Sequence, residues 1–253
     1  MGTQTRTTGL LLLAVCLLPL SLAYAAPAVG ELAPPTVAVQ NDAGAAGEAL
    51  VAVVTDGLTA RAQAMPELRA SLGQPWALDA KIAGASAAGG KAQVKLTAEL
   101  APPVGHIRYM AEAEGEGTSG ADAAGKASAD VMHELGLLVK AKGTVYHYGD
   151  KELEAWITIG QDQGIRVRAR VAFLVDGEVV GEGTVIQTKD MDSIVRVDKG
   201  VPAGNVTRGV DARVIKNGPR WAVREEMAQE SRHRGVGAFL ALAVIGGLIA
   251  AAR

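Results

Sequence analysis

The sequence predicts an α+β fold: a β-α-β-β-β-α sheet-and-helix domain, then a small antiparallel β-barrel, then an apolar carboxy-terminal helix. Three observations carry this prediction. Residues 36–140 change between the strand period of two and the helix period of 3.6. Residues 143–216 show only short strand patterns separated by glycine-rich turns. Residues 235–252 form an uncharged apolar run. We therefore expect two folded domains between the two ends of the chain.

Residues 1–25 have the layout of an export signal peptide. A short polar start with one cation, Arg6, precedes an apolar run from Leu10 to Leu22 and the triplet Ala23-Tyr24-Ala25. Small residues at both ends of that triplet suit signal peptidase, so we predict cleavage after Ala25. Two alternatives stay open: an uncleaved amino-terminal anchor, and lipidation of Cys16 in a poorly matching lipoprotein box.

Composition narrows the class of protein. The chain has 253 residues, one cysteine and a formal net charge of -2, from 25 Lys+Arg against 27 Asp+Glu. A dedicated nucleic-acid binder usually carries a basic excess, so no nucleic-acid partner is expected. If Cys16 leaves with the signal, the mature chain has no thiol, and neither a disulfide nor a cysteine-ligated metal is expected.

The predicted α+β domain spans residues 36–140. Asn41-Asp42 can cap the first helix, and Pro66 ends it. Short connectors rich in turn formers follow the next strands, so neighbouring strands should pair antiparallel. The expected elements in order are a strand at 36–40, a helix to 65, strands at 78–86, 91–100 and 105–114, and a helix at 121–140.

The predicted barrel domain spans residues 143–216 and centres on a hairpin. Apolar residues alternate with arginines from Ile165 to Val175, which is typical of a half-buried strand. Asp176-Gly177 then tolerates the positive φ angles of a type I′ turn into the strand 178–188. Closure of the sheet would remove its exposed edges. The other expected strands are 144–148, 153–159, 193–197 and 210–215.

Residues 220–234 are predicted to form a charged helical linker, and residues 235–252 the apolar helix. At 1.5 Å per residue this run just spans a hydrocarbon core of about 30 Å. The cations lie mostly before it, which opposes the positive-inside tendency for an exported domain. Two interpretations stay open: a transmembrane helix, and a helix buried in an oligomer or against another protein.

Residues 36–140 resemble the α+β domain shared by curli-secretion channel lipoproteins, the amino-terminal domain of TolB and lipoprotein activators of penicillin-binding proteins. The matching stretches are Thr36 to Val39, Val94 to Leu100, and Ala111 to Gly117 before the last helix. The curli channel type is lipidated and lines a pore. The poor lipid box and the 4% aromatic content of this chain depart from that type, so pore formation is not expected.

Residues 143–216 are similar to the small β-barrel at the end of flagellar assembly protein T. The stretches that carry the likeness are the turn Gly160 to Gly164, the hairpin turn Asp176-Gly177, and Gly181 to Val185. Both resemblances imply a periplasmic assembly or scaffold role, and neither brings a catalytic residue.

Two motifs have the residue types of a chemical site. Gly115 to Gly120 has the spacing of a dinucleotide fingerprint, but the strand before it alternates, so a strand-to-helix connector is the favoured interpretation. His133-Glu134 lies on a helix without the second histidine of a zinc protease, so a solvated helix face that includes Asp130 is favoured there. Packing is also the favoured role of Trp76, Trp156 and Trp221. No catalytic residue, metal ligand or cofactor is predicted.

Arg166, Arg168 and Arg170 form the candidate contact site for a partner or an anion. At alternate positions they would share one face of their strand, where three cations could hold phosphate or sulfate groups. The other interpretation is a solvated face paired across the hairpin with Glu178 and Glu182, with a bulge at a neighbouring glycine.

The sequence therefore predicts a non-enzymatic protein of the bacterial cell envelope that assembles or scaffolds other proteins in the periplasm. Expected partners are envelope proteins or further copies of this chain, and the membrane through residues 235–252. The alternative is a binding module for an anionic envelope polymer of lipopolysaccharide or peptidoglycan type, through the three arginines.

Overall fold

The computed structural model describes residues 34–68, 75–149, 153–202 and 204–220, all within one compact unit. The predicted signal peptide, residues 221–234 of the predicted linker and the apolar run 235–252 lie outside the described residues. None of the helices in the described ranges combines the length and the apolar character that crossing a membrane requires.

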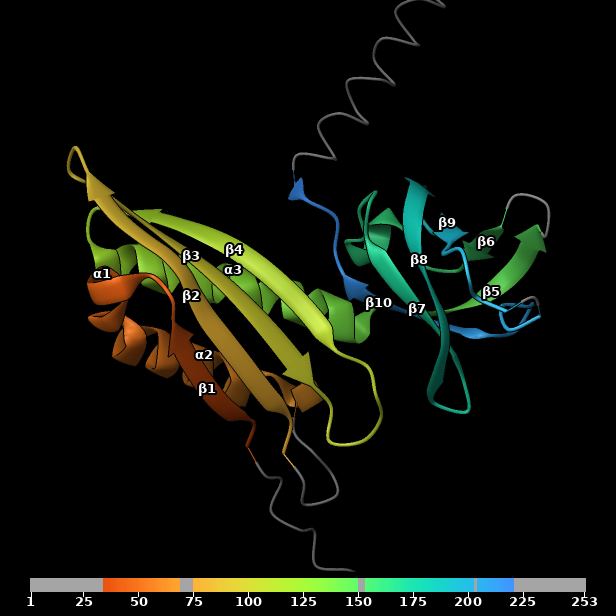
Figure 1. Ribbon diagram of the computed structural model, residues 1–253, viewed down its shortest axis with the longest axis horizontal. Coiled ribbons are helices and arrows are strands. Elements are labelled where there is room, and N and C mark those ends of the chain that lie inside the picture. Colours follow the sequence, from red (N-terminus) through yellow and green to blue (C-terminus); the bar gives the residue numbers. More distant parts are fainter. Residues whose placement is uncertain (1–33, 69–74, 150–152, 203, 221–253) are drawn as a thin grey trace, which may run out of the picture. The chain divides into compact units, whose positions relative to one another are not determined.

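The first part of the described chain is a mixed sheet covered by helices (Figure 1). Strand β1 runs parallel to β2, whereas β2, β3 and β4 pair antiparallel in the spatial order β1-β2-β3-β4. The elements in order are β1 (Thr36–Asn41), α1 (Gly44–Glu48), α2 (Val51–Ala64), the 3-10 turn η1 (Pro66–Leu68), β2 (Ala77–Ala88), β3 (Lys91–Ala101), β4 (Tyr109–Gly117) and α3 (Gly120–Lys140).

Helices α2 and α3 lie on one side of this sheet, as Figure 1 shows. Leu78, Ile82 and Leu96 of the sheet are fully buried with Leu135 and Leu138 of α3. Each such side chain contributes roughly 2 kcal/mol on leaving water. The alternate residues of the strands, among them Lys95, Glu112, Glu114 and Glu116, remain on the polar face.

The glycine-rich stretch that matched the dinucleotide spacing is the close contact between β4 and α3. A Cβ atom at Gly115 would lie 2.1 Å from the Ala123 carbonyl oxygen, and one at Gly117 would lie 2.6 Å from the Ala123 nitrogen. Ser119 caps α3, since its hydroxyl accepts the Asp122 N–H at 3.1 Å. Strand-to-helix packing thus accounts for these glycines.

The second part is a closed six-stranded antiparallel barrel, which confirms the predicted barrel. Its strands follow the order β10-β5-β6-β9-β8-β7, and β7 returns to pair with β10. Phe173, Ile157 and Val195 are buried in its core. The elements are β5 (Lys142–Gly149), β6 (Glu154–Ile157), the 3-10 turn η2 (Gln161–Gln163), β7 (Arg170–Val175), β8 (Glu178–Thr188), β9 (Ser193–Val197) and β10 (Asp211–Lys216).

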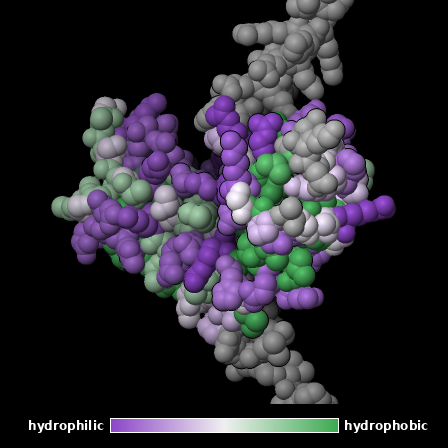
Figure 2. Space-filling view, turned by 45° about the vertical axis from the view of Figure 1, so that its right-hand side comes forward, coloured by the Kyte–Doolittle hydropathy of each residue, from purple (hydrophilic) through white to green (hydrophobic). Residues whose placement is uncertain are grey.

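The predicted hairpin turn is confirmed. Asp176 and Gly177 have φ angles of 52° and 86° and join β7 to β8, as a type I′ turn requires. The pairing shifts between Phe173, opposite Gly181, and Leu174, opposite Val179, so the hairpin also contains the expected bulge. On the surface of the barrel, Figure 2 shows apolar patches in green among hydrophilic residues.

The prediction of a strand from Ile165 to Val175 was wrong for its first half. Strand β7 begins at Arg170, and Arg168 has a φ angle of 69°, which an extended strand does not adopt. The segment instead turns, since the Ala169 N–H donates to the Arg166 carbonyl at 3.1 Å. Ile165 and Ala169 are buried, so core packing, not strand pairing, produced their alternation.

Candidate functional site

Within the described residues, most of one edge of strand β4 has no strand partner, and we call it the free edge of β4. The last residue of β10, Lys216, pairs in parallel with Met110, and this is the one pairing of β4 on the side away from β3 among the described residues. The chain then leaves the edge at Asn217. From Ala111 to Gly117 the backbone therefore presents hydrogen-bonding groups along roughly 20 Å, at about 3.3 Å per residue.

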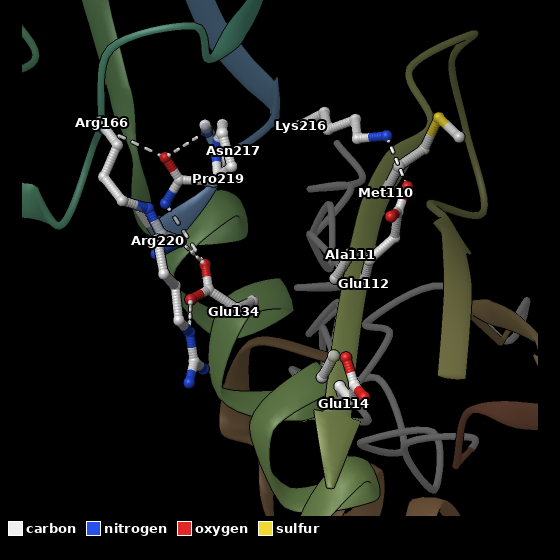
Figure 3. A pocket seen from close by; sticks show the side chains of 12 residues that line it. Met110, Ala111, Glu112, Glu114, Glu134, Arg166, Lys216, Asn217, Pro219 and Arg220 are labelled. Atoms are coloured by element: carbon white, nitrogen blue, oxygen red, sulfur yellow. Dashed lines mark hydrogen bonds and ion pairs between the residues drawn. The ribbon is translucent and has the colours of Figure 1, made fainter. Parts of the chain in front are cut away.

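A cavity of about 420 Å³ opens beside this edge. One wall is β4 from Met110 to Glu114, and the other is formed by Glu134, Arg166 and residues 216–220. Figure 3 shows Glu112 and Glu114 on the β4 side and Arg166, Asn217 and Arg220 around Glu134 on the other. The cavity therefore combines a strand edge with a set of paired charges.

Glu134 is the centre of those charges. It lies on α3, and the residue is 6% exposed. Its carboxylate accepts hydrogen bonds from the Arg166 guanidinium and, at 3.3 Å, from the Asn217 amide, and lies 3.6 Å from Nε of Arg220. A buried carboxylate is tolerated because such donors replace water around it.

Asn217 ties three segments together around Glu134. Its amide nitrogen also donates to the Gly164 carbonyl at 2.8 Å, and its amide oxygen accepts the Arg166 N–H at 3.0 Å. Gly218 follows so closely that a Cβ atom there would lie 1.9 Å from the Val167 carbonyl oxygen. The chain after β10 is thus fixed against the turn before β7 and against α3.

The polar face of β4 carries three glutamates at alternate positions of the strand. Lys216 donates to Glu112 at 2.6 Å, and this hydrogen bond lowers the pKa of the Glu112 carboxyl. Glu116 accepts a hydrogen bond from Gln93 at 3.1 Å. Glu114 makes no ion pair within the described ranges, although it lines the cavity. We call Glu112, Glu114 and Glu116 the acidic row.

The three arginines predicted as one contact face do not share a strand face. Arg166 is turned to Glu134, and Arg168 lies in the turn before β7. Arg170 alone is on β7, where it pairs with Glu182 at 2.6 Å and Asp198 at 2.7 Å. Hydrogen bonding to Asp198 is the main cause that raises the pKa of Arg170.

The expected pairing of the hairpin is thus confirmed for Glu182, whereas Glu178 lies 3.6 Å from His106 instead of facing an arginine. Residues 165–169 form a turn before β7 begins, so Arg166 is not on the strand and does not face the glutamates of β8.

Sequence reasoning missed the burial of Glu134. His133 is exposed on α3 and Asp130 pairs with Arg220 at 3.1 Å, but Glu134 faces inward and is not part of a solvated face. A signal was present, since Glu134 shares the helical stripe of Val131 and Leu138. No group of three potential metal-ligating side chains occurs in the part of the chain that the structure describes.

The tryptophans within the described ranges pack against other rings. Trp76 lies with its ring centre 6.4 Å from that of Tyr109, and Trp156 lies 4.6 Å from His147 across β5 and β6. The ring of Trp156 also covers the backbone at Gly149, where a Cβ atom would lie 3.5 Å away. Trp221 lies outside the described residues.

Comparison with solved structures yields a weak likeness. No family model matches the chain, and no curated protein matches it. The crystal structure of the Thermus thermophilus Protein Y N-terminal domain is similar at 17% identity over 41% of this chain and 97% of that chain, with a TM-score of 0.27. A TM-score this low carries no argument about fold or function.

Proposed function

We propose that this protein is a non-enzymatic assembly or scaffold factor of the bacterial cell envelope, exported by its first 25 residues and acting in the periplasm through contacts with other proteins. The resemblance of residues 36–140 and 143–216 to envelope assembly proteins supports this proposal. In the same proposal, residues 235–252 hold the protein at the membrane, and envelope proteins or further copies of the chain are its partners.

The observation that carries the proposal is the free edge of β4 from Ala111 to Gly117, with a cavity beside it. An unpaired strand edge is a template for another chain, and natural proteins usually cover or distort it. In the barrel, β7 pairs with β10 and closes the sheet, so its strands have no such open edge, whereas β4 does. Protein recognition by strand addition uses edges of this kind.

The alternative, a module that binds an anionic envelope polymer, has less support. Arg166 and Arg170 already pair with Glu134, Glu182 and Asp198. Binding a polymer phosphate would require these pairs to separate. Breaking the buried Arg166–Glu134 pair costs roughly 3–5 kcal/mol, whereas the more exposed pairs of Arg170 contribute less.

Crosslinking in intact envelopes, followed by purification of the tagged protein, tests the proposed function. A photoreactive residue at position 114 or at the hairpin position 179 should capture envelope proteins. Recovery of an envelope polymer with no protein partner would refute the scaffold role and favour the alternative. Mass spectrometry of the purified chain would also show whether it begins at Ala26.

A further inference from the structure

We propose that the free edge of β4 binds an extended, basic segment of a partner protein as an added strand beside Ala111–Gly117. This inference rests on the proposed function and names the chemistry of the partner. The partner segment must meet two requirements: its backbone must be able to pair with the edge, and it must carry cations at alternate positions.

The backbone requirement follows from the pairing of β4. Met110 is already paired on the outer side by Lys216, and from Ala111 onward that side has no strand partner among the described residues. An added strand would satisfy the N–H and C=O groups that point away from β3. Near the end of the edge, the Glu116 carbonyl already accepts a hydrogen bond from Lys126 at 3.0 Å, so the added strand would pair mainly beside Ala111 to Gly115.

The charge requirement follows from the acidic row. Glu112, Glu114 and Glu116 project from the same face of β4, so every second residue of an added strand would lie beside a glutamate. Opposite charges at such cross-strand positions are favourable, and like charges are not. The complementary segment therefore carries Lys or Arg at alternate positions.

Lys216 shows this chemistry within the chain itself. It is the residue of β10 that meets the β4 edge, and its ammonium lies 2.6 Å from a Glu112 carboxylate oxygen. Glu114 is the next glutamate along the row; Lys95 lies opposite it on β3, but Glu114 makes no ion pair within the described ranges. A partner segment would continue the pattern from the point where β10 departs.

The other face of the added strand constrains the partner as well. Its remaining side chains would enter the cavity of about 420 Å³ beside Ala111, Ala113 and the Glu134 cluster. This volume suits small or medium side chains. A second copy of the chain is a poor occupant, because pairing β4 with β4 would set one acidic row against another.

A synthetic peptide tests the inference on the full mature chain. The probe is acetyl-Thr-Lys-Val-Lys-Val-Lys-Thr-amide, with two controls: the same peptide with Glu in place of Lys, and the same peptide N-methylated at its three central residues. We expect the basic peptide alone to bind, to lose affinity with salt, and to slow amide hydrogen exchange within residues 111–117.

A charge reversal supplies the matched control on the protein. Glu114→Lys should weaken the basic peptide about fivefold or more at low salt, because an attraction becomes a repulsion. Asp56→Lys makes the same charge change at an exposed position of α2 and should leave the affinity unchanged. Circular dichroism melting of both variants checks that they remain folded.

The inference is overturned if the basic peptide does not bind, if the N-methylated peptide binds equally well, or if Glu114→Lys binds like the parent chain. It is also overturned if the amides of residues 111–117 are already protected in the free chain and truncation after residue 220 removes that protection, since the chain itself would then cover the edge. Capture of envelope proteins at position 179 but not at 114 would refute this inference alone, whereas no capture at either position would refute the proposed function.

Discussion

Replacing Arg166 by methionine should destabilise the protein through Glu134. The Arg166 and Glu134 side chains are 14% and 8% exposed, so the substitution leaves a buried carboxylate without its main partner. Breaking a buried ion pair in this way costs roughly 3–5 kcal/mol. Asn217 and Arg220 remain close to the carboxylate and still solvate part of its charge, so we expect a smaller cost, about 2–3 kcal/mol.

Thermal unfolding measures this cost. For a domain of this size, 1 kcal/mol shifts Tm by about 2–4 °C, so Arg166→Met should lower Tm by roughly 5–10 °C. The double variant Arg166→Met/Glu134→Met removes both charges while keeping apolar volume, and it should recover most of the loss. The reasoning is refuted if the single variant melts within about 2 °C of the parent, or if the effects of the two single substitutions simply add in the double variant.

Three further predictions concern packing, pH and backbone conformation. Gly115→Ala should cost about 3 kcal/mol or more in chemical denaturation, because its Cβ would overlap α3, whereas Gly125→Ala, with open space around its Cβ, should be neutral or stabilise by up to about 1 kcal/mol. The folded-state pKa of Glu112 is lowered by Lys216, so its contribution to stability is present above about pH 5 and is lost as the pH falls through that lowered value. Glu112→Gln should therefore lower the free energy of unfolding by about 0.5 kcal/mol at pH 7, because the pair is exposed, and a difference of equal size at pH 3 would contradict this. Gly177→Val should cost about 1–2 kcal/mol in urea unfolding, since its φ angle of 86° strains any residue with a Cβ, and an unchanged midpoint would contradict the type I′ turn.

Local pattern was enough to predict most of the elements. The strands around Val94 and Ile194 and the helix around Leu135 follow from period and turn residues. The turn at Asp176-Gly177 follows from residue type alone. The segment from Ile165 to Ala169 misled the prediction, because buried residues in a turn can alternate as a strand does, and only the tertiary contact with Asn217 distinguishes the two.

The candidate site could not be predicted because it depends on contacts between residues distant in sequence. In the sequence, Glu134 belongs to a predicted helix face and Arg166 to a predicted strand face. Their pairing needs α3 and the turn before β7 to meet, which no local period encodes. The free edge of β4 is equally non-local, since it depends on where β10 leaves the sheet.

The tight passage of Gly218 over Val167 has a mechanical consequence. The backbone there is wedged at a distance that leaves no room for a Cβ atom, and Arg220 is held on α3 by Asp130 and Glu134. A pulling force on the chain beyond Arg220 would therefore load α3 and the base of the barrel before it could peel β10 from its neighbours. The end of the described chain is therefore joined to α3 and to the turn before β7, and not to β10 alone.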